Sequence, residues 1–158
     1  MTSPATAPGA PATAPRPRRV LYADDVPQLQ QLLRIALGRD GHTVETVANG
    51  QEALALITAR PDAFDLLITD HHMPVMNGLE LVGRVRALPF PGRIIVFSSE
   101  LSHEVNEAYH RLQVDYILPK PIFPQTLRAL LATLWTGGAG AEKIPPGEPE
   151  RDEMKPAG

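Results

Sequence analysis

Short apolar runs alternate with helical patterns between residues 18 and 136, and this alternation limits the folds open to the chain. The runs are rich in strand-forming residues and cover residues 19–23, 42–47, 65–69, 93–97 and 115–118. The helical patterns that follow them cover residues 27–40, 51–58, 77–88, 102–112 and 124–135. Strands joined by helices through short loops pair in parallel with right-handed crossovers. The central runs are almost wholly apolar, as in strands covered by helices on both faces, so we expect a doubly wound α/β fold.

The first helical pattern predicts both a buried face and its own ends. Pro27 suits the first turn, where its missing N–H would have no partner in the helix. Gly41 is a suitable stop after the last turn. The residues expected on the buried face are Leu29, Leu32, Leu33 and Ala36.

The composition changes at both ends of this region. Residues 1–17 and 137–158 are rich in Pro, Ala and Gly and hold few large apolar side chains, so both segments are predicted to be disordered tails. The domain is therefore predicted at 18–136. The residues after Trp135 are too few, and of the wrong composition, for a DNA-binding or catalytic module, so we expect no output domain.

Charge and composition narrow the classes of function. The net charge of −3 gives no reason to expect binding to nucleic acid. The absence of cysteine excludes disulfides and thiolate metal sites. No apolar run is long enough to span a bilayer, and the N-terminus does not read as a signal peptide. A cytoplasmic protein without membrane contacts is the expectation.

Polar residues follow four of the five predicted strands. Ligands of doubly wound folds sit beyond the carboxyl ends of the strands, so these residues are the candidates for chemistry. Clustered carboxylates repel one another unless a cation joins them, and oxygen ligands favour Mg²⁺. A lysine and a serine beside them would suit a phosphoryl group, whose transfer needs mainly positioning and neutralised charge. The candidates are Asp24 and Asp25 after the first strand, Asp70 after the third, Ser98 after the fourth and Lys120 after the fifth.

The stretch ITDHHMPVMNG (68–78) offers a second interpretation, because Asp70, His71 and His72 could belong to a metal-dependent phosphohydrolase. Adjacent residues of an extended chain point to opposite sides, so the two histidines are not expected to share one metal with Asp70. Such an enzyme would also need further acidic clusters, for which the chain has no room. The phosphohydrolase remains the alternative hypothesis.

The motifs VLYADD, ITDHHMPVMNGLEL, IIVFSSE and LPKP together resemble the receiver domain of bacterial two-component response regulators. The resemblance covers essentially all of 18–136. It implies a flavodoxin-like sheet with strand order 2-1-3-4-5 and five surrounding helices. It also implies a signalling domain rather than a turnover enzyme. This domain would accept a phosphoryl group from a sensor histidine kinase or a histidine phosphotransfer protein. Phosphorylation would then change contacts with a downstream protein that the sequence does not identify.

The resemblance assigns roles residue by residue. It implies that Asp70 is the phosphoacceptor and that Asp25, Asp70 and the backbone carbonyl of His72 bind Mg²⁺. Asp24 would hold a metal-bound water from the second shell. Ser98 and Lys120 would contact the phosphoryl oxygens, and the peptide between Lys120 and Pro121 is expected to be cis.

Three positions bear on how such a receiver would behave. The site three residues before Lys120 usually holds an aromatic switch residue but is Ile117 here, with Tyr116 displaced to the other face of the strand. His72 and Glu100 are expected to border the path of water to an acyl phosphate, and so to be candidate modulators of its lifetime. A receiver-fold scaffold that binds partners without phosphorylation is a further alternative.

Overall fold

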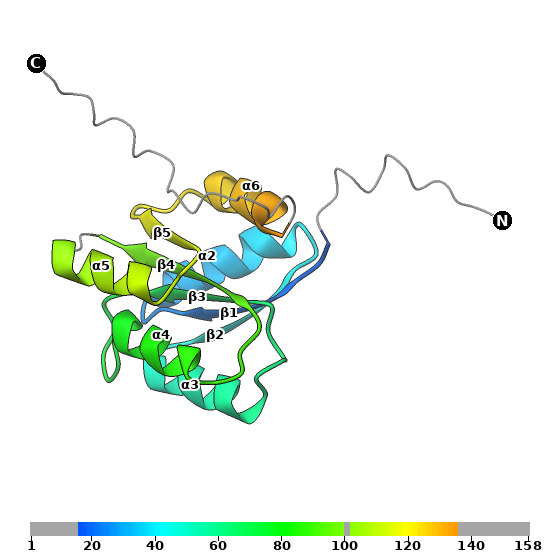
Figure 1. Ribbon diagram of the computed structural model, residues 1–158. Coiled ribbons are helices and arrows are strands. Elements are labelled where there is room, and N and C mark those ends of the chain that lie inside the picture. Colours follow the sequence, from blue (N-terminus) through cyan, green and yellow to red (C-terminus); the bar gives the residue numbers. More distant parts are fainter. Residues whose placement is uncertain (1–15, 100–101, 136–158) are drawn as a thin grey trace, which may run out of the picture.

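The computed structural model describes residues 16–99 and 102–135. The strands form one sheet in which every pairing is parallel, in the order β2-β1-β3-β4-β5 (Figure 1). They are β1 (Arg19–Ala23), β2 (Thr43–Val47), β3 (Leu66–Asp70), β4 (Arg93–Ser98) and β5 (Tyr116–Pro119). The predicted fold class and strand order are both confirmed.

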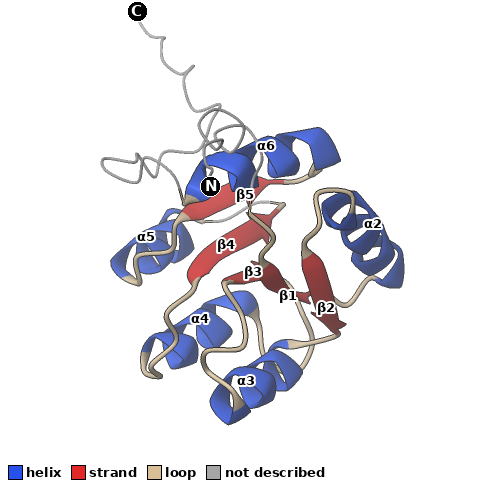
Figure 2. Cartoon of the chain, turned by 90° about the vertical axis from the view of Figure 1, so that its right-hand side faces the viewer, coloured by secondary structure: helices blue, strands red, loops and turns tan. Residues whose placement is uncertain are grey.

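Helices cover both faces of the sheet (Figure 2). They are α2 (Pro27–Gly38), α3 (Gly50–Ala59), α4 (Gly78–Arg86), α5 (His103–Arg111) and α6 (Pro124–Leu134). Apolar side chains of α2 and α6 form one core with one face of the sheet, and those of α3, α4 and α5 form a second core with the other face. The strand in the middle, β3, is therefore buried along its whole length, which explains its apolar sequence.

The register of the sheet brings the strand ends together. Asp70, the last residue of β3, lies beside Phe97, and Ser98 lies beside Pro119. The chain therefore leaves β3, β4 and β5 at nearly the same level, and Asp24 follows β1 directly. This common edge is where the sequence predicted the site.

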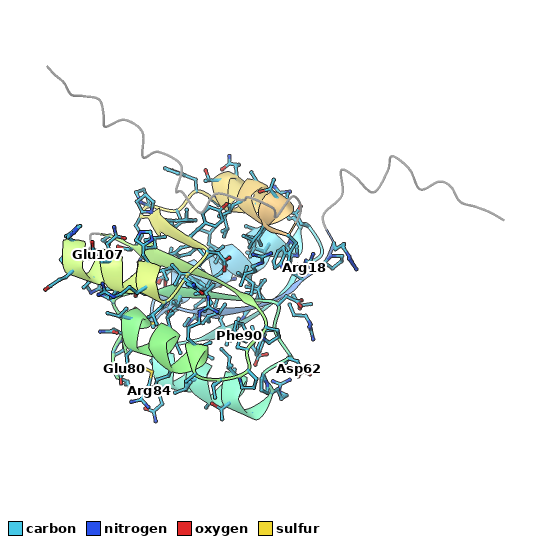
Figure 3. The ribbon with its side chains drawn as sticks, viewed as in Figure 1. Arg18, Asp62, Glu80, Arg84, Phe90 and Glu107 are labelled. Carbon is cyan, nitrogen blue, oxygen red and sulfur yellow. The ribbon has the colours of Figure 1, made fainter. Side chains whose placement is uncertain are left out.

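Side-chain caps define where three of the helices begin, and the first is Asn49, which accepts from the backbone N–H of Glu52 (2.9 Å) at the start of α3. The side chain of Asn77 accepts a hydrogen bond from the backbone N–H of Glu80 (2.8 Å), and Ser102 accepts one from Val105 (3.1 Å). The carboxylate of Glu80 pairs with Arg84 at 3.2 Å on the outer side of α4 (Figure 3).

The buried face predicted for the first helix was partly wrong. Leu32 is 40% exposed, whereas Leu37, which was not predicted, is completely buried. Leu33, Ala36 and Leu37 form the inner stripe, with the spacing of three and four residues that one helical face requires. Leu32 is as hydrophobic as the buried leucines, but it lies at the edge of that stripe and is therefore exposed.

Apart from Arg16 and Pro17, which are exposed, the tails predicted as disordered lie outside the described residues. Among the helices of the described part, none has the length and apolar character required to span a membrane.

Candidate functional site

Three carboxylates meet at the carboxyl edge of the sheet. One carboxylate oxygen each from Asp24, Asp25 and Asp70 lies within 4.8 Å of the other two. Asp24 and Asp70 are buried, whereas Asp25 is exposed. The cluster therefore reaches solvent on the side of Asp25.

Lys120 lies against this cluster. Its Nζ is 2.7 Å from Oδ1 of Asp70, and the lysine side chain is only 24% exposed. The backbone N–H of Lys120 donates to the carbonyl of Ser98 (2.9 Å), which fixes the start of the loop after β5 to the end of β4. The peptide bond to Pro121 is cis, as expected. Of the predicted residues, Asp24, Asp25, Asp70, Ser98 and Lys120 thus occupy one edge of the sheet.

The electrostatic state of Asp70 reflects its burial. Burial raises the pKa of its carboxyl group, and the charge of Asp24 acts in the same direction. The hydrogen bond and the charge of Lys120 lower this pKa, as does His72, but they do not cancel the effect of burial. A cation bound here would stabilise the ionised form of Asp70, which is buried beside a second carboxylate.

The position of Asp24 is fixed from two directions. Its Oδ2 accepts a hydrogen bond from the hydroxyl of Tyr22 (2.6 Å), and its Oδ1 accepts one from the backbone N–H of Val26 (2.9 Å). The side chain of Gln30 donates to the Asp24 carbonyl at 2.7 Å. Burial raises the pKa of Tyr22, and the hydrogen bond to Asp24 adds to this effect, so the phenol stays protonated. Tyr22 thus presents a fixed donor to Asp24.

The two histidines after Asp70 do not point to opposite sides, and that expectation was wrong. Their ring centroids are 4.7 Å apart, with the planes at 77°. The reason is that β3 ends at Asp70, so the alternation of an extended strand no longer applies to His71 and His72. His71 is buried and its Nδ1 lies 2.6 Å from the hydroxyl of Tyr109, whereas His72 is exposed.

Of the remaining candidate residues, the structure describes Ile117 and Ser98 but not Glu100. Ile117 packs into the core beneath α4 and α5, while Tyr116 packs into the opposite core, so the displacement of the aromatic ring to the other face is confirmed. Ser98 is buried at the end of β4. Glu100 lies outside the described residues.

The donor set suits a hard divalent cation. It consists of carboxylate oxygens, and within the described ranges no histidine belongs to a comparable group. Oxygen donors with one solvent-exposed member match the preference of Mg²⁺ for carboxylates and retained water. The burial of Asp70 and Asp24 leaves negative charge that such an ion would offset.

Two residues that hold the site were not predicted. Tyr22 and Tyr109 are completely buried, and the hydroxyl of each is hydrogen-bonded to a residue at this edge of the sheet. The partner of Tyr22 is Asp24, and the partner of Tyr109 is His71. A tyrosine in an apolar strand or on an inward helix face has the sequence pattern of a core residue. Only the position of the hydroxyl distinguishes it, and spacing alone does not supply that position.

Comparison with known proteins places the chain in a family. A family model described as the response regulator receiver domain matches residues 20–132. The chain belongs to this family. Receiver domains are signalling domains of two-component systems, and the fold and the acidic strand-end cluster described above agree with that class.

Individual relatives support the same assignment. A response regulator receiver protein of Anaeromyxobacter sp. is 38% identical over 66% of this chain and 43% of its own length. An uncharacterised 14.6 kDa protein of Leptolyngbya boryana is 35% identical over 71% of this chain and 86% of its own. The structure of the chemotaxis protein CheY4 of Vibrio cholerae shares 34% identity, with a TM-score of 0.67 over 73% of this chain and 97% of that chain. The chain thus spans less than half of the Anaeromyxobacter relative but almost all of CheY4.

Proposed function

We propose that this protein is a phosphoacceptor in a histidine-to-aspartate phosphorelay and that Asp70 receives the phosphoryl group. The observation that carries the proposal is the ion pair of 2.7 Å between Lys120 and Asp70 inside a cluster of three carboxylates. A lone buried ion pair would suit a structural role. Two further carboxylates beside this ion pair favour a binding site for a cation and an anionic ligand.

In this proposal Mg²⁺ would be held by Asp25, Asp70 and the backbone carbonyl of His72, and Asp24 would orient a water beside the ion. When bound, Mg²⁺ would neutralise charge on the phosphoryl oxygens. A carboxylate oxygen of Asp70 attacks phosphorus, the O–P bond forms, and the P–N bond to the donor imidazole breaks with its electron pair returning to nitrogen. Lys120 then exchanges its contact with the free carboxylate for one with a phosphoryl oxygen.

Ser98 is proposed to donate its hydroxyl to another phosphoryl oxygen, since it ends the strand next to β3 and is buried at the same edge. His72, exposed beside the site, is proposed to border the path by which water reaches the acyl phosphate. Hydrolysis of that intermediate would return Asp70 to its starting state without making the protein a turnover enzyme.

The proposed phosphoryl donor is a sensor histidine kinase or a histidine phosphotransfer protein, and the output is a contact with a further protein. Exposed apolar side chains on the loops around the site support contact with a protein donor. Val26 follows β1, Val75 follows β3 and Phe123 follows β5, and each is more than a third exposed. These loops surround the cluster that the donor must reach.

Incubation with acetyl phosphate, or with beryllofluoride as a mimic, tests the proposal when Mg²⁺ is present. The wild-type protein is expected to be modified on Asp70 alone, and Asp70→Asn should abolish the modification. Acid-labile, Mg²⁺-dependent label retained on Asp70→Asn would refute the assignment. Release of phosphate from unrelated monoesters would favour the phosphohydrolase instead, and partner binding unchanged by acyl phosphate would favour the scaffold.

A further inference from the structure

Tyr109 connects helix α5 to the backbone directly behind Asp70. It is the buried residue of α5, and its hydroxyl lies 2.6 Å from Nδ1 of His71, the residue after Asp70. The two partners are separated by 38 positions in the chain. A single buried hydrogen bond therefore joins a surface helix to the candidate phosphoacceptor loop.

His71 is held on three sides. Its backbone N–H donates to the carbonyl of Phe97 (3.0 Å) in β4, and its carbonyl accepts from the N–H of Gly78 (2.8 Å) at the start of α4. The imidazole provides the third connection, to Tyr109 in α5. The residue next to Asp70 is thus the point where β4, α4 and α5 meet.

The atoms around His71 and Gly78 are closely packed. A Cβ atom on Gly78 would lie 2.6 Å from the carbonyl oxygen of Asp70 and 2.7 Å from the hydroxyl of Tyr109. The Tyr109 hydroxyl, the Asp70–His71 peptide and the start of α4 are therefore in direct contact. In an interior packed this closely, a displaced hydroxyl moves its neighbours rather than filling a void.

The contact continues to His72, because the ring of His71 meets the ring of His72 edge-on with centroids 4.7 Å apart. The backbone carbonyl of His72 is the proposed third protein ligand of Mg²⁺. Both oxygens that this stretch would offer the ion, one from Asp70 and one from His72, are thus carried by backbone that His71 supports.

We propose that Tyr109 is a positioning residue for metal binding and phosphoryl acceptance, and that it acts through His71. The inference rests on the proposed function of Asp70. Tyr109 holds the backbone at residues 70–72 so that the Asp70 carboxylate and the His72 carbonyl face the same ion. Loss of an outer-shell partner commonly weakens metal binding about 10- to 100-fold, and Tyr109 acts one residue further out, so we expect about 3- to 10-fold.

A purely structural role gives a different expectation. If the hydroxyl only satisfies a buried imidazole, its removal lowers the stability of the fold but leaves the metal affinity of the folded protein unchanged. The dissociation constant for Mg²⁺, measured well below the unfolding temperature, separates the two roles.

The experiment compares the wild-type chain with Tyr109→Phe, which removes the hydroxyl and keeps the ring. Tyr116→Phe is the matched control, since it removes the same group from the core on the opposite face of the sheet. The dissociation constant for Mg²⁺ is obtained from NMR shifts of the amides near residues 24, 70 and 120. Tyr109→Phe should raise it about 3- to 10-fold, and Tyr116→Phe should leave it unchanged. Equal values for all three proteins would overturn the proposal.

A double-mutant cycle tests the route through His71. In a His71→Leu background, Tyr109→Phe should add no further loss of Mg²⁺ affinity, because the partner is already gone. Losses that multiply would show that Tyr109 does not act through His71, and would overturn the inference.

A measurement on the wild-type chain makes the test independent of any variant's folding. By thermodynamic reciprocity, Mg²⁺ should slow hydrogen exchange of the α5 amides around Tyr109. Unchanged exchange in α5 at saturating Mg²⁺ counts against the proposal. If acetyl phosphate fails to modify wild-type Asp70, the proposed function falls and this inference with it. If Asp70 is modified and Tyr109→Phe binds Mg²⁺ like wild type, only the inference fails.

Discussion

The hydroxyl of Tyr22 lies 2.6 Å from Oδ2 of Asp24, and this contact separates the roles of two adjacent aspartates. Asp24 is completely buried, with one oxygen bound to Tyr22 and the other to the backbone N–H of Val26. Asp25 is exposed, and it belongs to the same cluster of ligand oxygens. A carboxylate with both oxygens already hydrogen-bonded is better suited to orient water than to bind an ion directly.

We therefore expect Asp25→Ala to weaken Mg²⁺ binding more than Asp24→Ala does. Asp25 is proposed as a direct ligand, whereas Asp24 would act through a metal-bound water. NMR titration of the amides near residues 24, 70 and 120 measures both affinities. Equal losses would show that the assignment of direct and water-mediated roles is wrong.

The Tyr22 hydroxyl should contribute measurably to stability. Tyr22→Phe leaves a buried carboxylate with one hydrogen bond fewer, and hydrogen bonds to charged groups contribute about 1.5–3 kcal/mol. We expect the free energy of unfolding to fall by about 2 kcal/mol, with an unchanged denaturant m-value. In an Asp24→Ala background the same substitution should cost much less. A full loss in that background would mean that the Tyr22 hydroxyl stabilises the fold by some contact other than the one with Asp24.

The sequence was sufficient to predict the sheet and the residues that end its strands, because periodicity and strand length report directly on burial. The proximity of Asp25, Asp70 and Lys120 could be predicted, since the carboxyl ends of parallel strands lie at one edge of the sheet. The contacts of Tyr22 and Tyr109 could not, because they depend on side-chain directions set by packing. The relation of His71 to His72 was missed for a similar reason: the strand ends one residue too early for its alternation to apply.

Ile117 predicts an unusual response to phosphorylation. It occupies the usual aromatic position but carries no polar group that could follow a movement of Ser98. Hydrogen exchange should therefore change more in the loop after Ser98 than in β5 when Asp70 is modified. Ile117→Tyr should increase the change in β5. A largest change at residues 115–118 in the wild-type chain would contradict this prediction.

His42 makes stability depend on pH at the opposite edge of the sheet. Its Nδ1 accepts a hydrogen bond from the backbone N–H of Arg18 (2.9 Å), so this nitrogen must be unprotonated, and within the described residues its buried Nε2 has no hydrogen-bond partner. Burial lowers the pKa of His42 and the charge of Arg18 adds to this, although Asp40 acts in the opposite direction. The unfolded chain, in which the pKa is about 6.5, therefore binds this proton more readily than the folded protein does.

The stability contributed by neutral His42 should be complete above about pH 6.5 and decrease as the pH falls below it. The guanidinium of Arg18 lies 4.0 Å from the ring centroid of Trp135, the single tryptophan, so a displacement of Arg18 should change the tryptophan fluorescence. His42→Asn offers an amide oxygen in place of Nδ1 and does not titrate. Its unfolding free energy should vary less between about pH 5 and 6.5 than that of wild type. Parallel pH profiles would show that His42 does not cause the dependence.

Two glycines of helix α4 should respond to alanine with opposite signs. A Cβ on Gly78 would lie 2.6 Å from the carbonyl oxygen of Asp70 and 2.7 Å from the Tyr109 hydroxyl, whereas a Cβ on Gly83 would meet no atom within 4 Å. Gly83→Ala should raise the free energy of unfolding by up to about 1 kcal/mol, because alanine is the better helix former. Gly78 is the first residue of α4, so alanine gains less there, and its Cβ would force backbone atoms apart; overpacking of this kind costs about 1–3 kcal/mol. Denaturant unfolding of the two variants measures the difference directly. A stabilised Gly78→Ala would mean that the start of α4 can move away from Asp70 at little cost, and that the close packing around His71 does not fix the loop.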